Sequence, residues 1–196
     1  DYLKIDKFTY AGHSMGGGIG FLLGLNYAER LNKLILMAPI PSAGIAGEPN
    51  RELIAARLKA REENNRALFK SEMEATRFRP DVQTDEWFES RVDHLMRISE
   101  GHIVGGMETM HDLNVEAKLA TLQVPTLMLA GAVDGLLQAN LNDFMRLPDA
   151  SLHVFSRAGH DIAIHEPAGV SEAIDEFMQH GAVTAAKLMA QAAKGG

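Results

Sequence analysis

The stretch that decides the fold is Phe8–Gly20, FTYAGHSMGGGIG, in which one serine, Ser14, is surrounded by glycines. The apolar run 7–11 before it has the length of a short buried strand. Residues 15–29 after it have the pattern of a helix whose first turns carry small residues. A flexible linker would also be rich in glycine, but it would not follow an apolar strand. The stretch therefore predicts a sharp strand-to-helix turn with Ser14 at its apex.

The residues Gly12-His13-Ser14-Met15-Gly16 form the pattern G-x-S-x-G. Such a turn lifts a serine hydroxyl clear of the backbone, and the glycines give room where the two chain segments approach each other. The helix that follows points free N–H groups at the site, so the N–H of Met15 could hold a developing oxyanion. The pattern is short, and its flanking strand and helix are what favour a nucleophile over an ordinary turn serine.

Further apolar segments of strand length occupy residues 33–38, 126–130 and 150–155. Helical patterns occupy residues 138–145 and 166–180. Strands that alternate with helices are typical of an α/β fold, so we expect a parallel sheet of about four strands with flanking helices.

Residues 43–120 show no strand pattern and are rich in helix-forming residues. They predict a helical insertion between the second and third strands. The expected organisation is a core part at 1–42 with the serine turn, the insertion at 43–120, a second core part at 121–181, and a C-terminal tail at 182–196.

Composition narrows the classes of partner and site. The 196 residues carry a net charge of −7 and no basic run, so nucleic acid is not an expected partner. No apolar stretch approaches the ~20 residues that a membrane span needs. The absence of cysteine excludes disulfides and thiolate sites and is consistent with a reducing compartment such as the cytoplasm. We expect no metal and no cofactor.

An activated serine needs a base and an orienting acid, and both follow strand ends. Asp134 comes just after the strand 126–130, and His160 comes after the strand 150–155. Because the carboxyl ends of parallel strands meet at one edge of a sheet, these residues can converge with Ser14.

Other residues of the same types have less suitable positions. Asp161 adjoins His160 and is expected to point away from it, and Asp143 is expected on a solvated helix face. His13 is expected to pack or to line the pocket, and His165 to be a helix-start or surface residue. Three histidines of the insertion match no metal-binding spacing: His94, His102 and His111.

The segments GHSMGG, LMLAGAVD and SRAGHDIAIHEP, in this order, resemble the α/β-hydrolase superfamily, specifically its capped, esterase-like members. The resemblance covers nearly the whole chain. It implies that Ser14 is the nucleophile, His160 the base and Asp134 the acid. A serine nucleophile argues against the dehalogenase and epoxide-hydrolase branches, whose nucleophile is aspartate.

The resemblance implies cleavage of a carboxylic ester, lactone or thioester through an acyl-enzyme. The same three residues also serve carbon–carbon bond hydrolysis, acyl transfer and cofactor-free peroxidation, and the sequence does not separate these. A binding protein that keeps the fold without catalysis is the contrasting class.

In the family, a helical insertion at this place is a lid over the active site. The expected pocket residues are His13, Trp87, Met107 and Met110, and the apolar, adaptable methionines favour a small hydrophobic acyl or ring-bearing substrate.

The resemblance begins only at the strand that carries Ser14, whereas family members have further strands and a second oxyanion donor before it. We therefore expect the C-terminal half of an α/β-hydrolase fold, weakly active or inactive alone. Its first strand would be an exposed edge at which two copies could pair as a homodimer.

Overall fold

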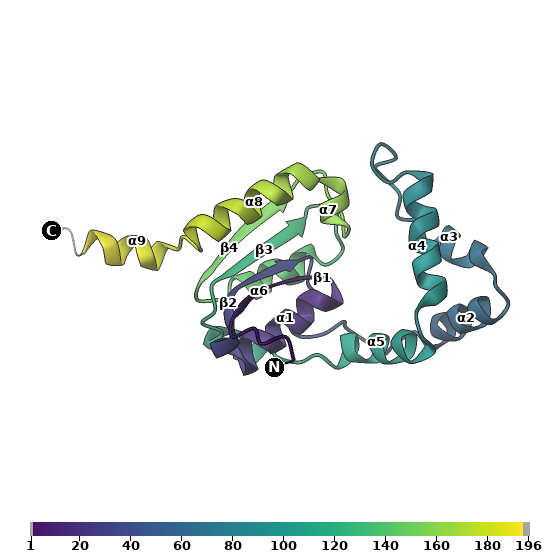
Figure 1. Ribbon diagram of the computed structural model, residues 1–196, viewed down its shortest axis with the longest axis horizontal. Coiled ribbons are helices and arrows are strands. Elements are labelled where there is room, and N and C mark those ends of the chain that lie inside the picture. The colour runs from purple at the N-terminus through teal and green to yellow at the C-terminus, as the bar shows by residue number, and fades with distance from the viewer. Residues whose placement is uncertain (1, 194–196) are drawn as a thin grey trace. The chain divides into compact units, whose positions relative to one another are not determined.

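Four parallel strands form a single sheet in the computed structural model, which describes residues 2–193 (Figure 1). The strands are β1 (Phe8–His13), β2 (Leu31–Met37), β3 (Thr126–Gly131) and β4 (Ala150–Phe155), in the spatial order β1-β2-β3-β4. Strands and helices alternate as a parallel sheet requires. The predicted α/β class and the parallel four-stranded sheet are thus confirmed.

The sheet buries both faces at its centre. All six residues of β3 are buried, as expected for a parallel strand covered on both sides. The register aligns Ile35 of β2 with Leu127 of β3, so these side chains lie on the same face of the sheet. They share one core cluster with Phe177 of the C-terminal helix.

Helices cover the two faces of the sheet. Helix α1 (Met15–Asn26) connects β1 to the 3₁₀ turn η1 (Ala28–Arg30) and packs on the face formed by Leu34 and Leu36. Helix α8 (Pro167–His180) packs on the opposite face, that of Ile35 and Leu127 (Figure 1).

The remaining elements of this unit follow the order of the chain. They are η2 (Glu116–Thr121), α6 (Leu137–Phe144) between β3 and β4, the short α7 (Ile162–His165), and α9 (Ala185–Ala192). Helix α9 buries none of its residues. It lies in the predicted tail 182–196, whose last three residues fall outside the described part of the chain.

The chain divides into two compact units, one formed by residues up to 45 and from 113 onward, and one formed by residues 46–112. The second unit is entirely helical, with α2 (Arg51–Glu62), α3 (Arg66–Glu74), α4 (Asp85–Arg97) and α5 (Glu100–Asp112). It is narrower than the insertion predicted at 43–120, because the first unit includes η2.

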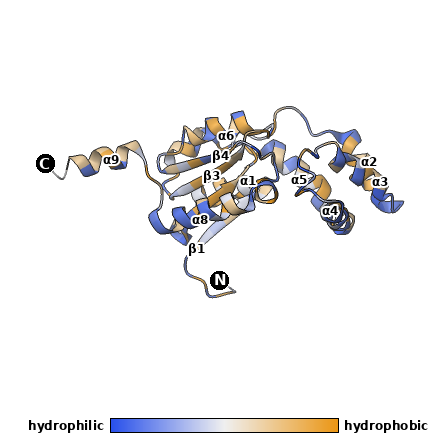
Figure 2. Cartoon of the chain, turned by 90° about the horizontal axis from the view of Figure 1, so that it is seen from above, coloured by the Kyte–Doolittle hydropathy of each residue, from blue (hydrophilic) through white to orange (hydrophobic). Residues whose placement is uncertain are grey.

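The helical unit has its own core, formed by Ala60, Phe69 and Val92. Two of its helices begin at side-chain caps. The N–H of Leu53 donates to Asn50 Oδ1 at 2.9 Å, and that of Trp87 donates to Thr84 Oγ1 at 3.2 Å. Helices of both units carry apolar and polar stretches side by side, as helices with one buried face do (Figure 2).

No helix among residues 2–193 combines the length and the apolar character that a membrane crossing would require.

Candidate active site

Ser14 lies at the apex of the turn between β1 and α1, with an unusual backbone conformation of φ 55° and ψ −117°. A residue with a side chain pays of order 1–3 kcal/mol for such a conformation, so the surroundings must impose it. The N–H of Ser14 donates to Met37 O at 3.0 Å, and its carbonyl accepts from Gly18 N at 3.1 Å and from Ile40 N at 2.9 Å.

The turn closes because Gly12 has no side chain. A Cβ at this position would lie 2.4 Å from the carbonyl oxygen of Gly16. The hydroxyl of Tyr10 donates to the same oxygen at 2.8 Å and supports the turn from below. Gly12 and Gly16 therefore lie where the sequence placed them, at the crossing of strand and helix.

Ser14, His160 and Asp134 form a continuous chain of hydrogen bonds. His160 Nε2 lies 2.8 Å from Ser14 Oγ, and His160 Nδ1 lies 2.9 Å from Asp134 Oδ2. Because a carboxylate only accepts, Nδ1 carries a proton and Nε2 is left as the acceptor for the serine hydroxyl. The structure thus brings together the three residues that the sequence singled out, from the ends of three strands.

The acid is held in place on two sides. Its Oδ1 accepts the N–H of Leu136 at 3.0 Å, while Oδ2 faces His160. The strand end before it approaches the histidine loop closely, since a Cβ on Gly131 would lie 2.4 Å from Gly159 O. This close approach sets the short distance between Asp134 and His160.

The pair polarises its own titration. Burial opposes the charged form of Asp134, but the hydrogen bond from His160 and the N–H of Leu136 outweigh it and lower the pKa of the carboxyl. Burial alone would likewise depress the imidazole, but the hydrogen bond and charge of Asp134 raise the pKa of His160 above its usual value. Such a histidine accepts a proton readily and is stabilised once it has done so.

Access and a positive end of a helix complete the geometry. The side chain of His160 is 39% exposed while that of Asp134 is 6% exposed, so the base faces solvent and the acid does not. Met15 is the first residue of α1, where backbone N–H groups have no partner within the helix. Its N–H therefore has the position expected of an oxyanion donor.

His13 contacts the base directly. Its Nε2 lies 2.8 Å from the carbonyl oxygen of His160, and the two rings are 4.8 Å apart. Because a carbonyl only accepts, Nε2 of His13 carries a proton. The other expected pocket residues, Trp87, Met107 and Met110, belong to the helical unit, and their role stays a prediction.

Two expectations about polar residues were wrong. Asp143 is not solvated but 2% exposed, and it accepts the N–H of Ser42 at 2.8 Å and its hydroxyl at 2.5 Å. Burial raises the pKa of Asp143 in spite of these bonds. His165 is not a surface residue either, since it is 2% exposed and its Nδ1 accepts the N–H of Gly159 at 3.2 Å.

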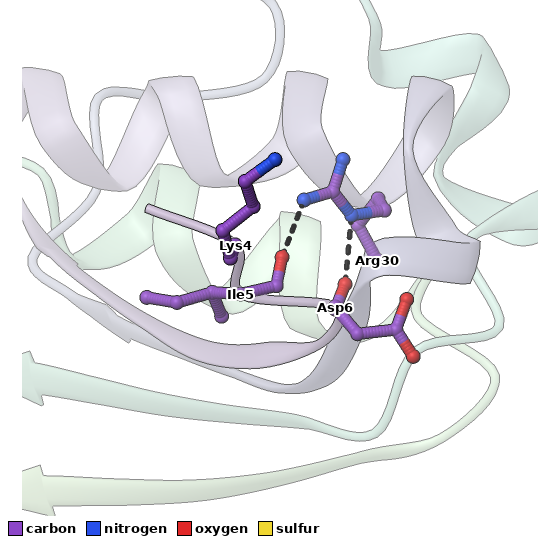
Figure 3. Close-up of a pocket in the computed structure, with 4 residues that line it drawn as sticks. All are labelled: Lys4, Ile5, Asp6 and Arg30. Atoms are coloured by element: carbon purple, nitrogen blue, oxygen red, sulfur yellow. Dashed lines mark hydrogen bonds between the residues drawn. The ribbon is translucent and has the colours of Figure 1, made fainter. Parts of the chain in front are cut away.

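A separate open pocket of about 400 Å³ is lined by Lys4, Ile5, Asp6 and Arg30 (Figure 3). The guanidinium of Arg30 donates to the carbonyl oxygens of Asp6 and Ile5 at 2.7 and 2.8 Å. These residues precede β1 and β2, so the pocket lies at the amino ends of the strands, whereas Ser14 and Asp134 follow carboxyl ends. Within residues 2–193, no group of three histidine or acidic side chains is placed to hold a metal ion.

Comparisons with known proteins agree with this geometry. The model of the family described as "Serine aminopeptidase, S33" (Hydrolase_4) matches residues 3–168. A 2-hydroxy-6-oxononadienedioate/2-hydroxy-6-oxononatrienedioate hydrolase from Pseudomonas sp. is 28% identical over 82% of this chain and 59% of its own length. The corresponding hydrolase of Comamonas testosteroni is 31% identical over 82% of this chain and 58% of its own length.

Solved structures show the same fold. A hydrolase from Pseudomonas aeruginosa superposes with a TM-score of 0.78 at 24% identity, over 91% of this chain and 67% of its own. An enol-lactonase from Burkholderia xenovorans gives a TM-score of 0.75 at 18% identity, over 91% of this chain and 68% of its own. The chain spans less than 60% of the length of the two curated relatives named above. With the family match over most of its length, it belongs to the serine aminopeptidase S33 family of the α/β-hydrolase superfamily.

Proposed function

We propose that the protein is a serine hydrolase that cleaves a carboxylic ester, lactone or thioester through an acyl-enzyme on Ser14. The observation that carries the proposal is the hydrogen-bonded chain from Ser14 Oγ through His160 to Asp134, with contacts of 2.8 and 2.9 Å. A serine hydroxyl is a weak nucleophile unless a base takes its proton, and this arrangement supplies the base together with its orienting acid.

The reaction follows from these roles. Ser14 Oγ attacks the carbonyl carbon while His160 Nε2 takes the hydroxyl proton, and the N–H of Met15 stabilises the oxyanion. The tetrahedral intermediate expels the alcohol or thiol, which leaves with the proton from His160. Water then attacks the acyl carbon with His160 again as base, so that the carboxylic acid is released and Ser14 regains its proton. Asp134 stabilises the imidazolium in both halves.

Hydrolysis of a carbon–carbon bond is the second candidate, and the names of the relatives favour it. Both curated relatives are named as hydrolases of 2-hydroxy-6-oxo dienoic acids. The same nucleophile can cleave such a bond when the carbon leaving group is stabilised as an enolate by conjugation and is then protonated to give C–H. The acyl part still leaves as a carboxylic acid.

A substrate panel on the protein and its Ser14→Ala variant separates these candidates. We expect turnover of activated esters or lactones, reduced at least ~10³-fold by the substitution. Faster loss of the dienol chromophore of a 2-hydroxy-6-oxo-dienoate than of any ester would make carbon–carbon hydrolysis the function. Ligand binding that Ser14→Ala leaves unchanged, with no turnover of either class, would identify a non-catalytic binding protein.

A further inference from the structure

The segment after β2, Ala38–Ser42, contacts the backbone of Ser14 without contributing a side chain to the proposed chemistry. The N–H of Ile40 donates to the carbonyl of Ser14 at 2.9 Å. Ala38, at the start of the segment, is buried and has a φ of 42°, a conformation that a residue with a side chain rarely adopts. A segment that begins in such a conformation keeps its path only if other contacts impose it.

Two buried side chains of α6 supply those contacts. Asn140 Nδ2 donates to Pro39 O at 2.8 Å, and Asn140 is 1% exposed. One turn further along the helix, the carboxyl of Asp143 accepts both the N–H and the hydroxyl of Ser42. Each end of the segment is thereby bonded to one face of α6.

Ser42 also fixes the returning chain. Its carbonyl accepts the N–H of Val115 at 2.7 Å, just after the helical unit ends. The two connections between the sheet unit and the residues of the helical unit therefore meet at Ser42, which uses its N–H, hydroxyl and carbonyl at once.

Helix α6 is itself attached to the acid. It begins directly after Asp134, whose carbonyl accepts the N–H of Leu137 at 3.1 Å. A single helix thus runs from the Asp134 loop to the segment that holds the Ser14 carbonyl.

We propose that Asn140 and Asp143 are positioning residues that set, through Pro39, Ile40 and Ser42, where Ser14 lies relative to Asp134 and His160. The inference rests on the proposed function, because its consequence is the reactivity of Ser14. A displacement of a reacting group by about 1 Å can cost ~10²-fold in rate, so these bonds can control reactivity without touching a substrate.

The test is the rate at which a fluorophosphonate inactivates the chain, measured with the final stoichiometry of labelling. Asp143→Leu removes both bonds to Ser42 and is expected to lower the rate constant of inactivation by ~10-fold or more. Asp143→Asn keeps an acceptor for the Ser42 N–H and a donor for its hydroxyl, so it should stay within ~3-fold of the unsubstituted chain. Asn140→Ala removes the Pro39 bond alone and should also slow labelling.

Thr126→Val is the matched control. Thr126 is fully buried in β3, and its hydroxyl donates to Val124 O, away from the segment. It should lower stability without changing the rate constant. A purely structural role of Asp143 would lower the labelled fraction of Asp143→Leu but leave the rate constant of the folded molecules unchanged, and that result would overturn the inference.

The two proposals fail in different ways. If the unsubstituted chain takes no label, the proposed function fails. If it takes the label and both Asn140→Ala and Asp143→Leu react at its rate, only the positioning role fails.

Discussion

At the scale of single residues, Ser14 combines two demands that oppose each other. Its conformation, with φ at 55°, costs free energy, and the same conformation presents the hydroxyl to His160 at 2.8 Å. Three backbone hydrogen bonds and the missing side chain of Gly12 hold it there. Strain at a reactive residue is kept when the surrounding structure over-determines it.

Gly12→Ala tests how closely the turn depends on this glycine. The added Cβ would lie 2.4 Å from Gly16 O, which is backbone and cannot move aside cheaply. We expect a loss of about 1–3 kcal/mol in the free energy of unfolding and slower labelling of Ser14. Urea unfolding measures the first and a fluorophosphonate the second.

Gly105→Ala in α5 is its control, because no atom lies within 4 Å of an added Cβ there. This substitution should be neutral or stabilise by about 0.5–1 kcal/mol. Equal effects of the two substitutions would contradict the role given to Gly12.

Asp134→Asn tests the electrostatics of the pair. His160 must be neutral to accept the serine proton, and Asp134 raises the pKa of His160, so activity should fall as the pH drops through a value above 6.5. Without the carboxylate charge that pKa falls, and the acid limb of kcat/KM should move to lower pH, with kcat reduced by ~10⁴-fold. A pH–rate profile of both proteins checks this, and an unmoved acid limb would show that another group controls it.

Residues differ in how far the sequence predicts them. Ser14, Asp134 and His160 follow strand ends, and strand ends are visible as the close of apolar runs. Asp143 and His165 were misplaced because their partners are backbone groups far from any pattern, Ser42 N–H and Gly159 N–H. Hydrophobic periodicity records which face of an element is apolar, and it carries no sign of a polar side chain satisfied by a tertiary hydrogen bond.

At the scale of elements, the strands could be predicted to within about two residues. The predicted strand 150–155 matches β4, and 126–130 lacks only Gly131 of β3. The helix predicted at 15–29 ends earlier, at Asn26, where η1 begins. Helix ends depend on tertiary contacts of the last turn, so their bounds are less visible in sequence than apolar strand cores.

The difference between inner and edge strands gives a prediction about stability. Leu129 in β3 is fully buried, whereas Val154 in β4 is 44% exposed. Leu129→Ala should lower the free energy of unfolding by about 2–5 kcal/mol, and Val154→Ala by only about 0.5 kcal/mol. Denaturant unfolding followed by circular dichroism measures both. Similar losses would mean that β3 is not the centre of the core.

At the scale of the whole molecule, the chain consists of a sheet unit and a helical unit, each with its own buried cluster. Separate cores allow separate local unfolding. The boundaries of the helical unit could not be predicted closely, because η2 is helical in sequence pattern but packs with α1 in the sheet unit.

Phe69→Ala tests this independence. Phe69 is 2% exposed in the core of the helical unit, and its loss should cost that unit about 3–5 kcal/mol. Hydrogen exchange should then speed up across residues 46–112 while the amides of β3 keep their protection. Equal loss of protection in β3 would show that the two units unfold as one.

The central claim is that the folded chain activates Ser14, and intact mass after exposure to a fluorophosphonate tests it most directly. Ser14→Ala and a heat-denatured sample are the controls. The account predicts one adduct per chain, absent from both controls. A chain that takes no adduct while hydrogen exchange shows β3 to be folded would contradict it, as would an adduct that persists in Ser14→Ala.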